Sequence, residues 1–244
     1  MKSFLLIHLH IPKCAGTTLN NILGNNFQGE CYAFGNQKHD IEFNEKSPSE
    51  RSKDYRVAFG HLKYGIHEKF QTDDFVYFSV LRDPIERICS LFNYIHLKSE
   101  HPLNAGFKTS LIDLNDITED FIETEPGVKG NFRNYMSSAL LGRRCSTYLD
   151  FENLKLHIEK LMSEDRMKIG SFEYVKNELN QFIDNKAVDS NVKLNVTKDL
   201  LKEKSGLDFE VANVKTLSNS TYELLSKINI FDIRIFEKYI NIDH

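Results

Sequence analysis

The sequence contains no tryptophan, few prolines, few cysteines and no apolar run of membrane-spanning length. Its four cysteines, Cys14, Cys31, Cys89 and Cys145, are scattered without a C-x-x-C pair, which disfavours both a disulfide framework and a zinc site. The apolar run at the amino terminus is short and interrupted by histidines, so it suits neither a membrane span nor a signal peptide. We therefore expect reduced thiols, no bound metal, no membrane span and a cytoplasmic location.

The chain also lacks a strong excess of charge of either sign. A formal net charge of -4 disfavours a nucleic-acid partner but leaves room for a local basic pocket that binds a small anion. With 41% hydrophobic and 27% charged residues, the composition is that of an ordinary globular protein. A length of 244 residues suffices for a substantial core, and we expect one domain over residues 1–244.

Apolar runs alternate with amphipathic stretches, the pattern of a parallel sheet covered by helices. The expected strands are Phe4–Ile11, Arg56–Leu62, Phe75–Leu81 and Lys168–Ser171. Helical periodicity occurs at Thr17–Leu23, Pro84–Leu97, Asp116–Glu123, Phe132–Leu141, Phe151–Ser163, Tyr174–Ile183 and Ser220–Tyr239. We interpret two polar stretches as surface excursions and a third as a long loop placed to cover a site; they are Asn36–Tyr55, Asp184–Lys204 and Lys98–Asn115. The pattern predicts an α/β fold, with three α/β/α layers around a central parallel sheet.

The first turn of chemical interest joins the opening strand to the first helix, in the sequence PKCAGTT at Pro12–Thr18. A helix start presents free backbone N–H groups and a positive dipole end, Gly16 permits close approach, and Lys13 adds a point charge. The hydroxyl groups of Thr17 and Thr18 supply further donors. The turn is therefore a candidate phosphate-binding loop, although its lysine precedes the glycine, unlike that of a Walker A loop. A plain strand-to-helix connection with a solvated lysine is the alternative.

A second turn, RDPIERICS at Arg82–Ser90, follows the third expected strand. Asp83 is a good N-cap residue, the proline after it suits the first helical position, and Glu86 completes a capping-box spacing. Arg82 can then reach over the helix start, and Ser90 lies away from the apolar face of the helix. Together they are candidates to grip a second phosphate, Arg82 through its planar fork and Ser90 through its hydroxyl group. The alternative is that Arg-Asp-Pro only marks the start of a helix and binds no ligand.

The two turns together resemble a known family. PKCAGTT resembles the P-K-x-x-G-[ST]-[ST] loop of sulfotransferases that use 3'-phosphoadenosine 5'-phosphosulfate (PAPS), and RDPIERICSLF at Arg82–Phe92 resembles their R-D-P-x-x-R-x-x-S element. In style they match the carbohydrate sulfotransferases of the sulfotransferase-2 type, including the heparan sulfate 2-O-sulfotransferases. The resemblance implies a P-loop nucleotide-binding fold, PAPS as donor, 3'-phosphoadenosine 5'-phosphate (PAP) as product, and a carbohydrate hydroxyl group as acceptor. It assigns the donor to Lys13, Cys14, Ala15, Gly16, Thr17, Thr18, Arg82 and Ser90.

Further segments resemble the same family. FGHLKYG at residues 59–65 is similar to its Gly-His segment, which carries the catalytic base, and NFRNYMSSALLG at 131–142 resembles its N-x-x-x-[RY] helix near the acceptor. KIGSFEYVKNELNQF at 168–182 resembles a later strand and helix, and NVKT at 213–216 a loop closing over the nucleotide. Golgi members carry an amino-terminal anchor, whereas this chain starts almost at its first strand, which favours a prokaryotic or cytosolic enzyme.

Sulfuryl transfer needs a cation near the leaving oxygen and a base near the acceptor hydroxyl group. Lys13 is the candidate for the cation. His61 is the candidate for the base because it ends an expected strand, at the sheet edge where ligands collect. A structural histidine is the alternative at that position, with His67 and Glu68 as replacement bases. Cys14 is interpreted as filler, unless the helix start and Lys13 lower its pKa.

Several other polar residues are open to interpretation. His8 and His10 share a face of the first strand and are expected to be structural, whereas His101 in the long loop is a candidate acceptor contact. Arg87 is interpreted first as a solvated helix arginine and otherwise as part of the 3'-phosphate region. Three more arginines suit either a solvated surface or an anionic acceptor: Arg133, Arg143 and Arg144.

Two other function classes remain open from the sequence. An atypical P-loop kinase acting on a nucleotide or small molecule would use the same turn, although the shifted lysine argues against it. A non-catalytic nucleotide-binding protein would keep the fold without transferring a group.

Overall fold

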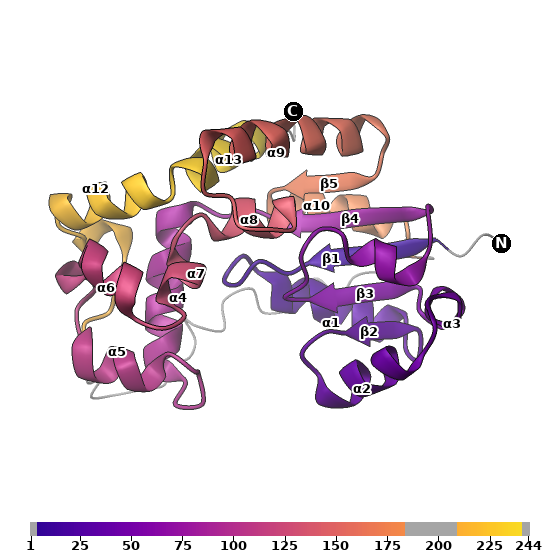
Figure 1. Ribbon diagram of the computed structural model, residues 1–244, viewed down its shortest axis with the longest axis horizontal. Helices are drawn as coiled ribbons and strands as arrows, with labels where there is room; N and C mark the ends of the chain where they lie inside the picture. Colours follow the sequence, from indigo (N-terminus) through magenta and orange to yellow (C-terminus); the bar gives the residue numbers. More distant parts are fainter. Residues whose placement is uncertain (1–3, 184–208, 241–244) are drawn as a thin grey trace.

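Five parallel strands form the centre of the protein in the computed structural model, which describes residues 4–183 and 209–240. The strand order across the sheet is β2-β3-β1-β4-β5 (Figure 1). The strands are β1 (Leu5–Leu9), β2 (Cys31–Ala33), β3 (Val57–Gly60), β4 (Phe75–Val80) and β5 (Met167–Gly170). The predicted α/β class with a central parallel sheet in a three-layer, P-loop-like arrangement is confirmed.

Helices cover the sheet and extend beyond its carboxyl edge (Figure 1). The α-helices are α1 (Gly16–Asn26), α2 (Gln37–Glu45), α3 (Pro48–Asp54), α4 (Pro84–Leu97), α5 (Asn104–Ser110), α6 (Glu119–Thr124), α7 (Val128–Phe132), α8 (Tyr135–Leu141), α9 (Tyr148–Ser163), α10 (Phe172–Asn180), α12 (Asn219–Ile228) and α13 (Ile230–Tyr239). Short 3-10 helices are η1 (Ile66–Phe70), η2 (Leu114–Asp116) and η3 (Val214–Thr216). None of the helices in the described ranges is both long and apolar enough to cross a membrane.

The strand order brings the ends of three strands together. β1 pairs with β3 on one side, with Leu9 opposite Gly60, and with β4 on the other, with His8 opposite Phe78. Because the strands are parallel, the segments that follow β3, β1 and β4 emerge side by side at one edge. From β1 the chain continues to β2 and β3 on one side of β1, and then crosses to β4 on the other side. Such a switch point is where open α/β sheets bind ligands.

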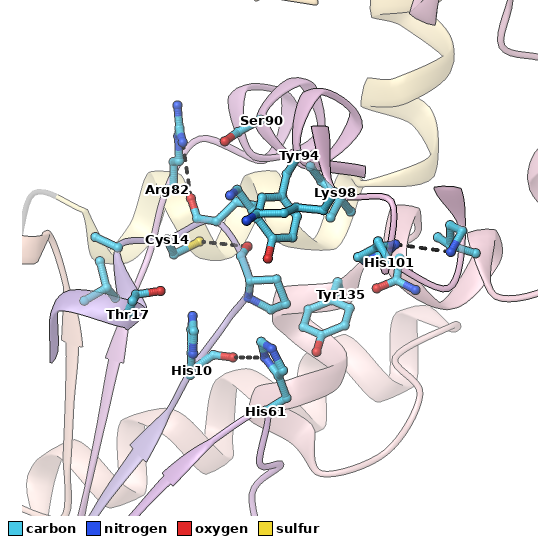
Figure 2. Close-up of a pocket in the computed structure, with 18 of the residues that line it drawn as sticks. His10, Cys14, Thr17, His61, Arg82, Ser90, Tyr94, Lys98, His101 and Tyr135 are labelled. Carbon is cyan, nitrogen blue, oxygen red and sulfur yellow. Dashed lines mark hydrogen bonds between the residues drawn. The ribbon is translucent and has the colours of Figure 1, made fainter. Parts of the chain in front are cut away.

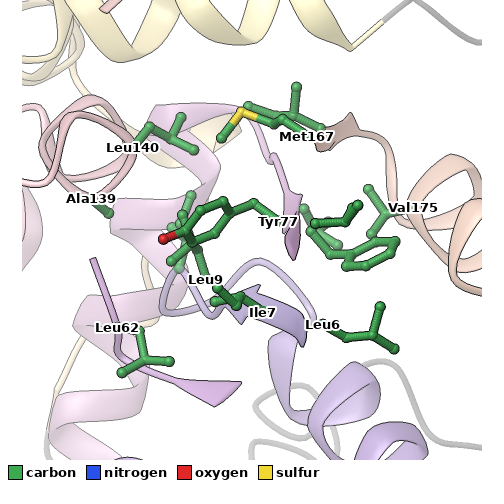
Figure 3. Packing of buried hydrophobic residues seen from close by; sticks show 14 of the residues in the cluster. Leu6, Ile7, Leu9, Leu62, Tyr77, Ala139, Leu140, Met167 and Val175 are labelled. Carbon is green, nitrogen blue, oxygen red and sulfur yellow. The ribbon is translucent and has the colours of Figure 1, made fainter. Parts of the chain in front are cut away.

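The main core lies on both faces of the sheet. Alternate residues of a strand point to opposite faces, and every residue of β1 is buried, as expected when helices cover both sides. Ile7, Leu9 and Tyr77 lie toward α8, whereas Leu6 lies toward Val175 of α10 (Figure 3). The aliphatic and aromatic packing on both faces holds β1, and with it the turn that follows β1, in a fixed position.

A second core lies beyond the carboxyl ends of the strands. The strand arrowheads point toward α4, α5, α6, α7 and α12, which we call the helical lobe (Figure 1). Its centre is α4, whose apolar side chains pack against those of the surrounding helices; the buried set includes Ile88, Phe92, Ile95, Phe107, Phe132 and Leu225. The helical lobe therefore forms a wall facing the edge of the sheet where the segments after β1, β3 and β4 emerge.

Buried polar contacts join the carboxyl-terminal helices to α8. The amide oxygen of Asn229 accepts a hydrogen bond from the Asn134 N–H (3.0 Å), and the Asp232 carboxylate accepts from the N–H groups of Met136 (3.0 Å) and Ser137 (2.8 Å). A negative group at a helix start is favourable because it satisfies free N–H groups and the helix dipole. These contacts fix the start of α8 between the main core and the helical lobe.

Differences from the sequence-based elements have identifiable causes. The surface excursion expected at 36–55 is mostly exposed, but it contains two helices that were not predicted, α2 and α3, which Asn36 and Ser47 cap, and it buries Phe43 and Tyr55. β2 was missed since three residues are too short to show an alternation. The helix expected at 220–239 is two helices that meet at Asn229. The stretch Asp184–Lys204, expected to be a second surface excursion, lies outside the described residues.

Candidate active site

A pocket of about 1100 Å³ lies between the carboxyl edge of the sheet and the helical lobe. The sheet side comprises His10, the turn Pro12–Thr18, and His61. The lobe side comprises residues of α4, of the connection to α5, and of the α7–α8 region: Ser90, Leu91, Tyr94, Lys98, His101, Pro102, Leu103, Pro126, Gly127, Asn131 and Tyr135. Figure 2 shows His10 and His61 along one side of this pocket, with Arg82 and Ser90 along another.

The turn after β1 has a tightly folded backbone. Lys13 and Ala15 both adopt left-handed conformations, with φ of 70° and 61°, on either side of Cys14. Left-handed non-glycine residues cost free energy and are concentrated at functional sites, where such turns aim successive N–H groups into a concavity. The helix α1 then begins at Gly16, so its free N–H groups open onto the same pocket. The turn has the backbone expected of an anion site.

Gly16 has a different reason to be glycine from the one suggested by the sequence. A Cβ atom placed on Gly16 would lie 1.9 Å from Cδ2 of His10. The imidazole ring of His10 therefore fills the space beneath the start of α1. The close approach that Gly16 permits is an approach to a side chain of the protein itself, in addition to any ligand above it.

Lys13 reaches across the pocket to the helical lobe. Its Nζ lies 4.0 Å from the centre of the Tyr94 ring, in a cation–π contact. Burial, together with the positive charge of Arg82, lowers the pKa of Lys13 to about 8. Tyr94 was not identified from the sequence. The signal was available, since Tyr94 lies four residues after Ser90 and therefore on the same side of α4.

Arg82 links the two turns. Its Nη1 donates a hydrogen bond to the Lys13 carbonyl oxygen (3.2 Å), and its Nε donates to Glu86 Oε2 (3.3 Å). Asp83 caps α4 by accepting hydrogen bonds from the N–H groups of Ile85 and Glu86 (both 2.9 Å). The cap sets the start of α4, and the arginine ties that start to the first turn. Ser90 lies two turns further along α4 and lines the same pocket.

His61 follows β3 and occupies the pocket edge beside His10. Its Nδ1 lies 3.1 Å from the His10 carbonyl oxygen. A carbonyl oxygen only accepts hydrogen bonds, so the contact assigns the proton of a neutral His61 ring to Nδ1 and leaves a lone pair on Nε2. The ring is exposed and lines the pocket. Nε2 of His61 can therefore accept a proton from a group in the pocket.

The two alternative bases lie elsewhere. His67 is in η1, where its Nδ1 is 2.7 Å from the Tyr77 hydroxyl group, and its ring packs 4.0 Å from that of Phe75. Neither His67 nor Glu68 lines the pocket. Burial lowers the pKa of His67. Their nearness to His61 in sequence does not become nearness in space, because η1 turns away from the carboxyl edge of the sheet.

Arg87 is fully buried, so its interpretation as a solvated helix arginine was wrong. Its Nη2 donates to the carbonyl oxygen of Asn131 (2.8 Å), and its guanidinium lies 5.4 Å from the centre of the Tyr135 ring. It interacts through its charge with the buried carboxylate of Asp232, whose pKa burial raises. Arg87 therefore supports, from behind, two residues that line the pocket.

The remaining candidates have plain structural contacts. Burial raises the pKa of Cys14 to about 12, which agrees with its interpretation as filler and not with the alternative of a lowered pKa. Arg133 forms ion pairs with Glu119 (3.5 Å) and Glu123 (2.7 Å), and Arg143 pairs with Asp150. His101 does line the pocket, as expected for a residue of the connection after α4. Val214–Thr216 forms η3 against α4 and is not among the lining residues.

The central parallel sheet and the pocket at its carboxyl edge define an α/β fold of the P-loop-like type, with a tightly folded turn after the central strand. A model of the Sulfotransferase family matches residues 2–239, and the chain belongs to that family. It is thus an enzyme of the PAPS-dependent sulfotransferase class. No curated protein matches the chain by sequence.

Proposed function

We propose that this enzyme moves a sulfuryl group from PAPS to a hydroxyl group of a carbohydrate, with His61 as the base. The observation that carries the proposal is the convergence of the Pro12–Thr18 turn, His61, Arg82 and Ser90 on one pocket from three neighbouring strand ends. Donor-binding groups and a proton acceptor are thereby held by the same sheet edge. Family membership favours this chemistry over the kinase and over a non-catalytic nucleotide-binding protein.

The donor would bind along the sheet side of the pocket. In the proposed arrangement, the N–H groups of Ala15, Gly16 and Thr17 hold the 5'-phosphosulfate region, with the two threonine hydroxyl groups as further donors. The N–H groups of Cys14 and Thr18 donate to the carbonyl oxygens of Ile11 and Ala15 within the turn. Lys13 neutralises the charge that grows on the bridging oxygen, and Arg82 and Ser90 hold the 3'-phosphate of PAPS. The lining fits a polyanion, because the described residues of the pocket include Lys13, Arg82 and Lys98 and no carboxylate side chain.

The acceptor would enter between His61 and the helical lobe. Nε2 of His61 takes the proton of the acceptor hydroxyl group as the acceptor oxygen bonds to sulfur. The bond between sulfur and the bridging phosphate oxygen breaks, and PAP leaves. The volume of about 1100 Å³ exceeds what one drug-sized ligand needs, so a donor and part of a second substrate fit together. Tyr94, His101, Asn131 and Tyr135 provide the mixture of flat rings and hydrogen-bonding groups that suits a sugar.

Calorimetric titration with PAP tests the donor half of the proposal. We expect PAP to bind the wild-type protein, and Lys13→Ala and Arg82→Ala each to weaken binding by about tenfold or more, because hydrogen bonds to charged groups contribute about 1.5–3 kcal/mol. Lys38→Ala is the matched control, since the Lys38 side chain is 81% exposed and lies in the first turn of α2, outside the pocket lining. A folded wild-type protein that does not bind PAP would refute the proposal.

Transfer of labelled sulfate from PAPS to an array of glycans tests the acceptor half. We expect labelled product from at least one glycan class, and its loss in His61→Ala with PAP affinity retained, because His61 is proposed to act on the acceptor. Labelling that persists in His61→Ala would remove the histidine from the mechanism. Magnesium-dependent turnover of ATP would instead support the kinase.

A further inference from the structure

The imidazole ring of His10 is enclosed between the donor turn and His61. It stacks on the His8 ring at 5.7 Å between centroids, and it lies 4.7 Å from the His61 ring on its other side. Its edge meets Gly16, where an added Cβ would come within 1.9 Å. The ring therefore touches both the start of α1 and the proposed base.

A single amide side chain fixes the orientation of the His10 ring. Asn20 Oδ1 lies 2.6 Å from His8 Nδ1, and Asn20 Nδ2 lies 3.2 Å from His10 Nδ1. The amide oxygen accepts and the amide nitrogen donates, so His8 carries its proton on Nδ1 and His10 carries its own on Nε2. Burial lowers the pKa of His8 to about 4 and that of His10 to about 2. Both rings are therefore neutral at pH 7.

The backbone of His10 also holds His61. The His10 N–H donates to the Gly60 carbonyl oxygen (3.0 Å), and the His10 carbonyl oxygen accepts from His61 Nδ1 (3.1 Å; Figure 2). One residue thus contacts His61 in two ways, through a carbonyl oxygen that selects the tautomer and through a ring that limits where the imidazole of His61 can lie. A neutral ring provides this support without placing a second positive charge beside Lys13.

We infer that His10 is a positioning residue that couples the donor turn to the base: its ring, held by Asn20 and pressed against Gly16, keeps His61 in the orientation that directs Nε2 into the pocket. This inference rests on the proposed role of His61. A displacement of the turn at Gly16 has to move the His10 ring, and the His10 ring cannot move without changing its contact with His61. The state of the donor turn is in this way transmitted to the tautomer and position of the base.

Two substitutions test separately the contribution of the His10 ring and that of its hydrogen bond to Asn20. His10→Phe keeps a flat ring and removes the acceptor for Asn20, whereas His10→Gln keeps a polar partner for Asn20 and removes the ring. Nitrogen-15 NMR of the histidine rings reads the tautomer of His61 directly. In His10→Gln we expect the ratio of Nδ1–H to Nε2–H tautomer of His61 to fall by about fivefold, the factor that corresponds to one ordinary hydrogen bond. His10→Phe loses the bond to Asn20 but keeps a flat ring enclosed between Gly16 and the rings of His8 and His61, so we expect the ratio to stay near that of the wild type.

The outcomes are distinguishable from failure of the proposed function. An unchanged His61 tautomer in His10→Gln overturns the inference, and so does an equal loss in both variants or a loss in His10→Phe alone. Should His10→Gln not fold, His10→Leu provides the ring-free comparison. PAP titration of the same samples reports the donor site separately. A wild-type protein that does not bind PAP contradicts the proposed function, whereas retained PAP binding with an unaltered His61 contradicts only the coupling through His10.

Discussion

At the scale of single residues, Lys13 carries a charge that depends on its surroundings in the pocket. It lies between a tyrosine ring and the guanidinium of Arg82, and burial is the main cause of its lowered pKa, about 8 instead of about 10.5. The protonated amine is the form that attracts a phosphate or sulfate group. A polyanion bound beside Lys13 stabilises the protonated amine. When Lys13 is deprotonated in the free protein, it must therefore take up a proton as the anion binds.

PAP binding should therefore weaken as the pH rises through 8. Above the pKa of Lys13, one proton must be taken up on binding, and we expect the association constant to fall by up to about tenfold per pH unit. Calorimetry at pH 7, 8, 9 and 10 measures this. Lys13→Arg provides the control, because an arginine stays protonated throughout that range and should give a nearly constant affinity. An equal decline in both proteins would assign the titration to another group.

Arg87 marks the limit of what a helical pattern indicates about one residue. The periodicity of Ile88, Leu91 and Phe92 predicted correctly which side of α4 faces a core. Arg87 lies next to that apolar side in the helical pattern, and it was therefore interpreted as solvated. The structure buries α4 on most sides, because α5, α12, α13 and η3 all pack against it. Long-range packing of this kind leaves no mark in the local spacing of residues.

At the scale of secondary-structure elements, the end of β3 determines where His61 lies. Gly60 has a φ of 126°, which disfavours any residue with a side chain, and a Cβ there would lie 2.7 Å from the Phe34 carbonyl oxygen. The neighbouring strand β2 thereby restricts the residue that precedes the proposed base. Sequence reasoning identified the Gly-His pair by resemblance, and the structure adds the steric reason for the glycine.

Substitution of Gly60 by alanine should be costly for the fold. We expect Gly60→Ala to lower the free energy of unfolding by more than about 1 kcal/mol, because the left-handed backbone and the contact with Phe34 both oppose a Cβ. Gly130→Ala is the control: Gly130 lies in α7 with open space around it, so alanine should raise the free energy of unfolding by up to about 1 kcal/mol. Urea denaturation of the three proteins measures both. Equal stabilities would contradict the steric argument.

The elements that could be predicted from the sequence are those with strong local signals. α4 has the predicted limits because Asp83 and Pro84 give a strong local start signal. The break between α12 and α13 at Asn229 was missed, because it is imposed by a buried contact to Asn134 far away in sequence. The donor turn was identified from Lys13 and Gly16, and on the lobe side of the pocket the sequence indicated Ser90 and His101. Asn131 and Tyr135 reach the pocket through tertiary packing of α7 and α8, which local spacing does not reveal.

At the scale of the whole molecule, two hydrophobic cores share one polar boundary. The main core surrounds the sheet and the second fills the helical lobe. Arg87, reaching from α4 to Asn131, and Asp232, bonded to the start of α8, lie where the two meet. Separating the cores would remove the charge interaction between the buried Arg87 and Asp232 and the contact of Arg87 with the Tyr135 ring. We propose that residues 1–244 form a single domain for this reason.

Hydrogen exchange in increasing urea should then show one cooperative unit. We expect the slowest-exchanging amides of β1 and of α4 to report the same free energy of opening and the same dependence on urea, because loss of either core exposes the shared boundary. Mass spectrometry of peptides from the two regions measures this, and peptides from α2 and α3, which lie outside the boundary, serve as an internal comparison. Opening of the helical lobe at lower urea, with β1 still protected, would indicate two domains.

The division of the pocket between sheet and lobe has a consequence for how such an enzyme diversifies. The groups proposed for the donor are on the strand ends, the first turn of α1 and the first two turns of α4. Other polar side chains of the pocket come from connections and short helices: Lys98, His101, Asn131 and Tyr135. Insertions or exchanges in those connections leave the hydrogen bonds of the sheet intact. If the lobe binds the acceptor as proposed, we expect a graft of a lobe segment from another protein to alter acceptor preference while the groups proposed for the donor stay in place.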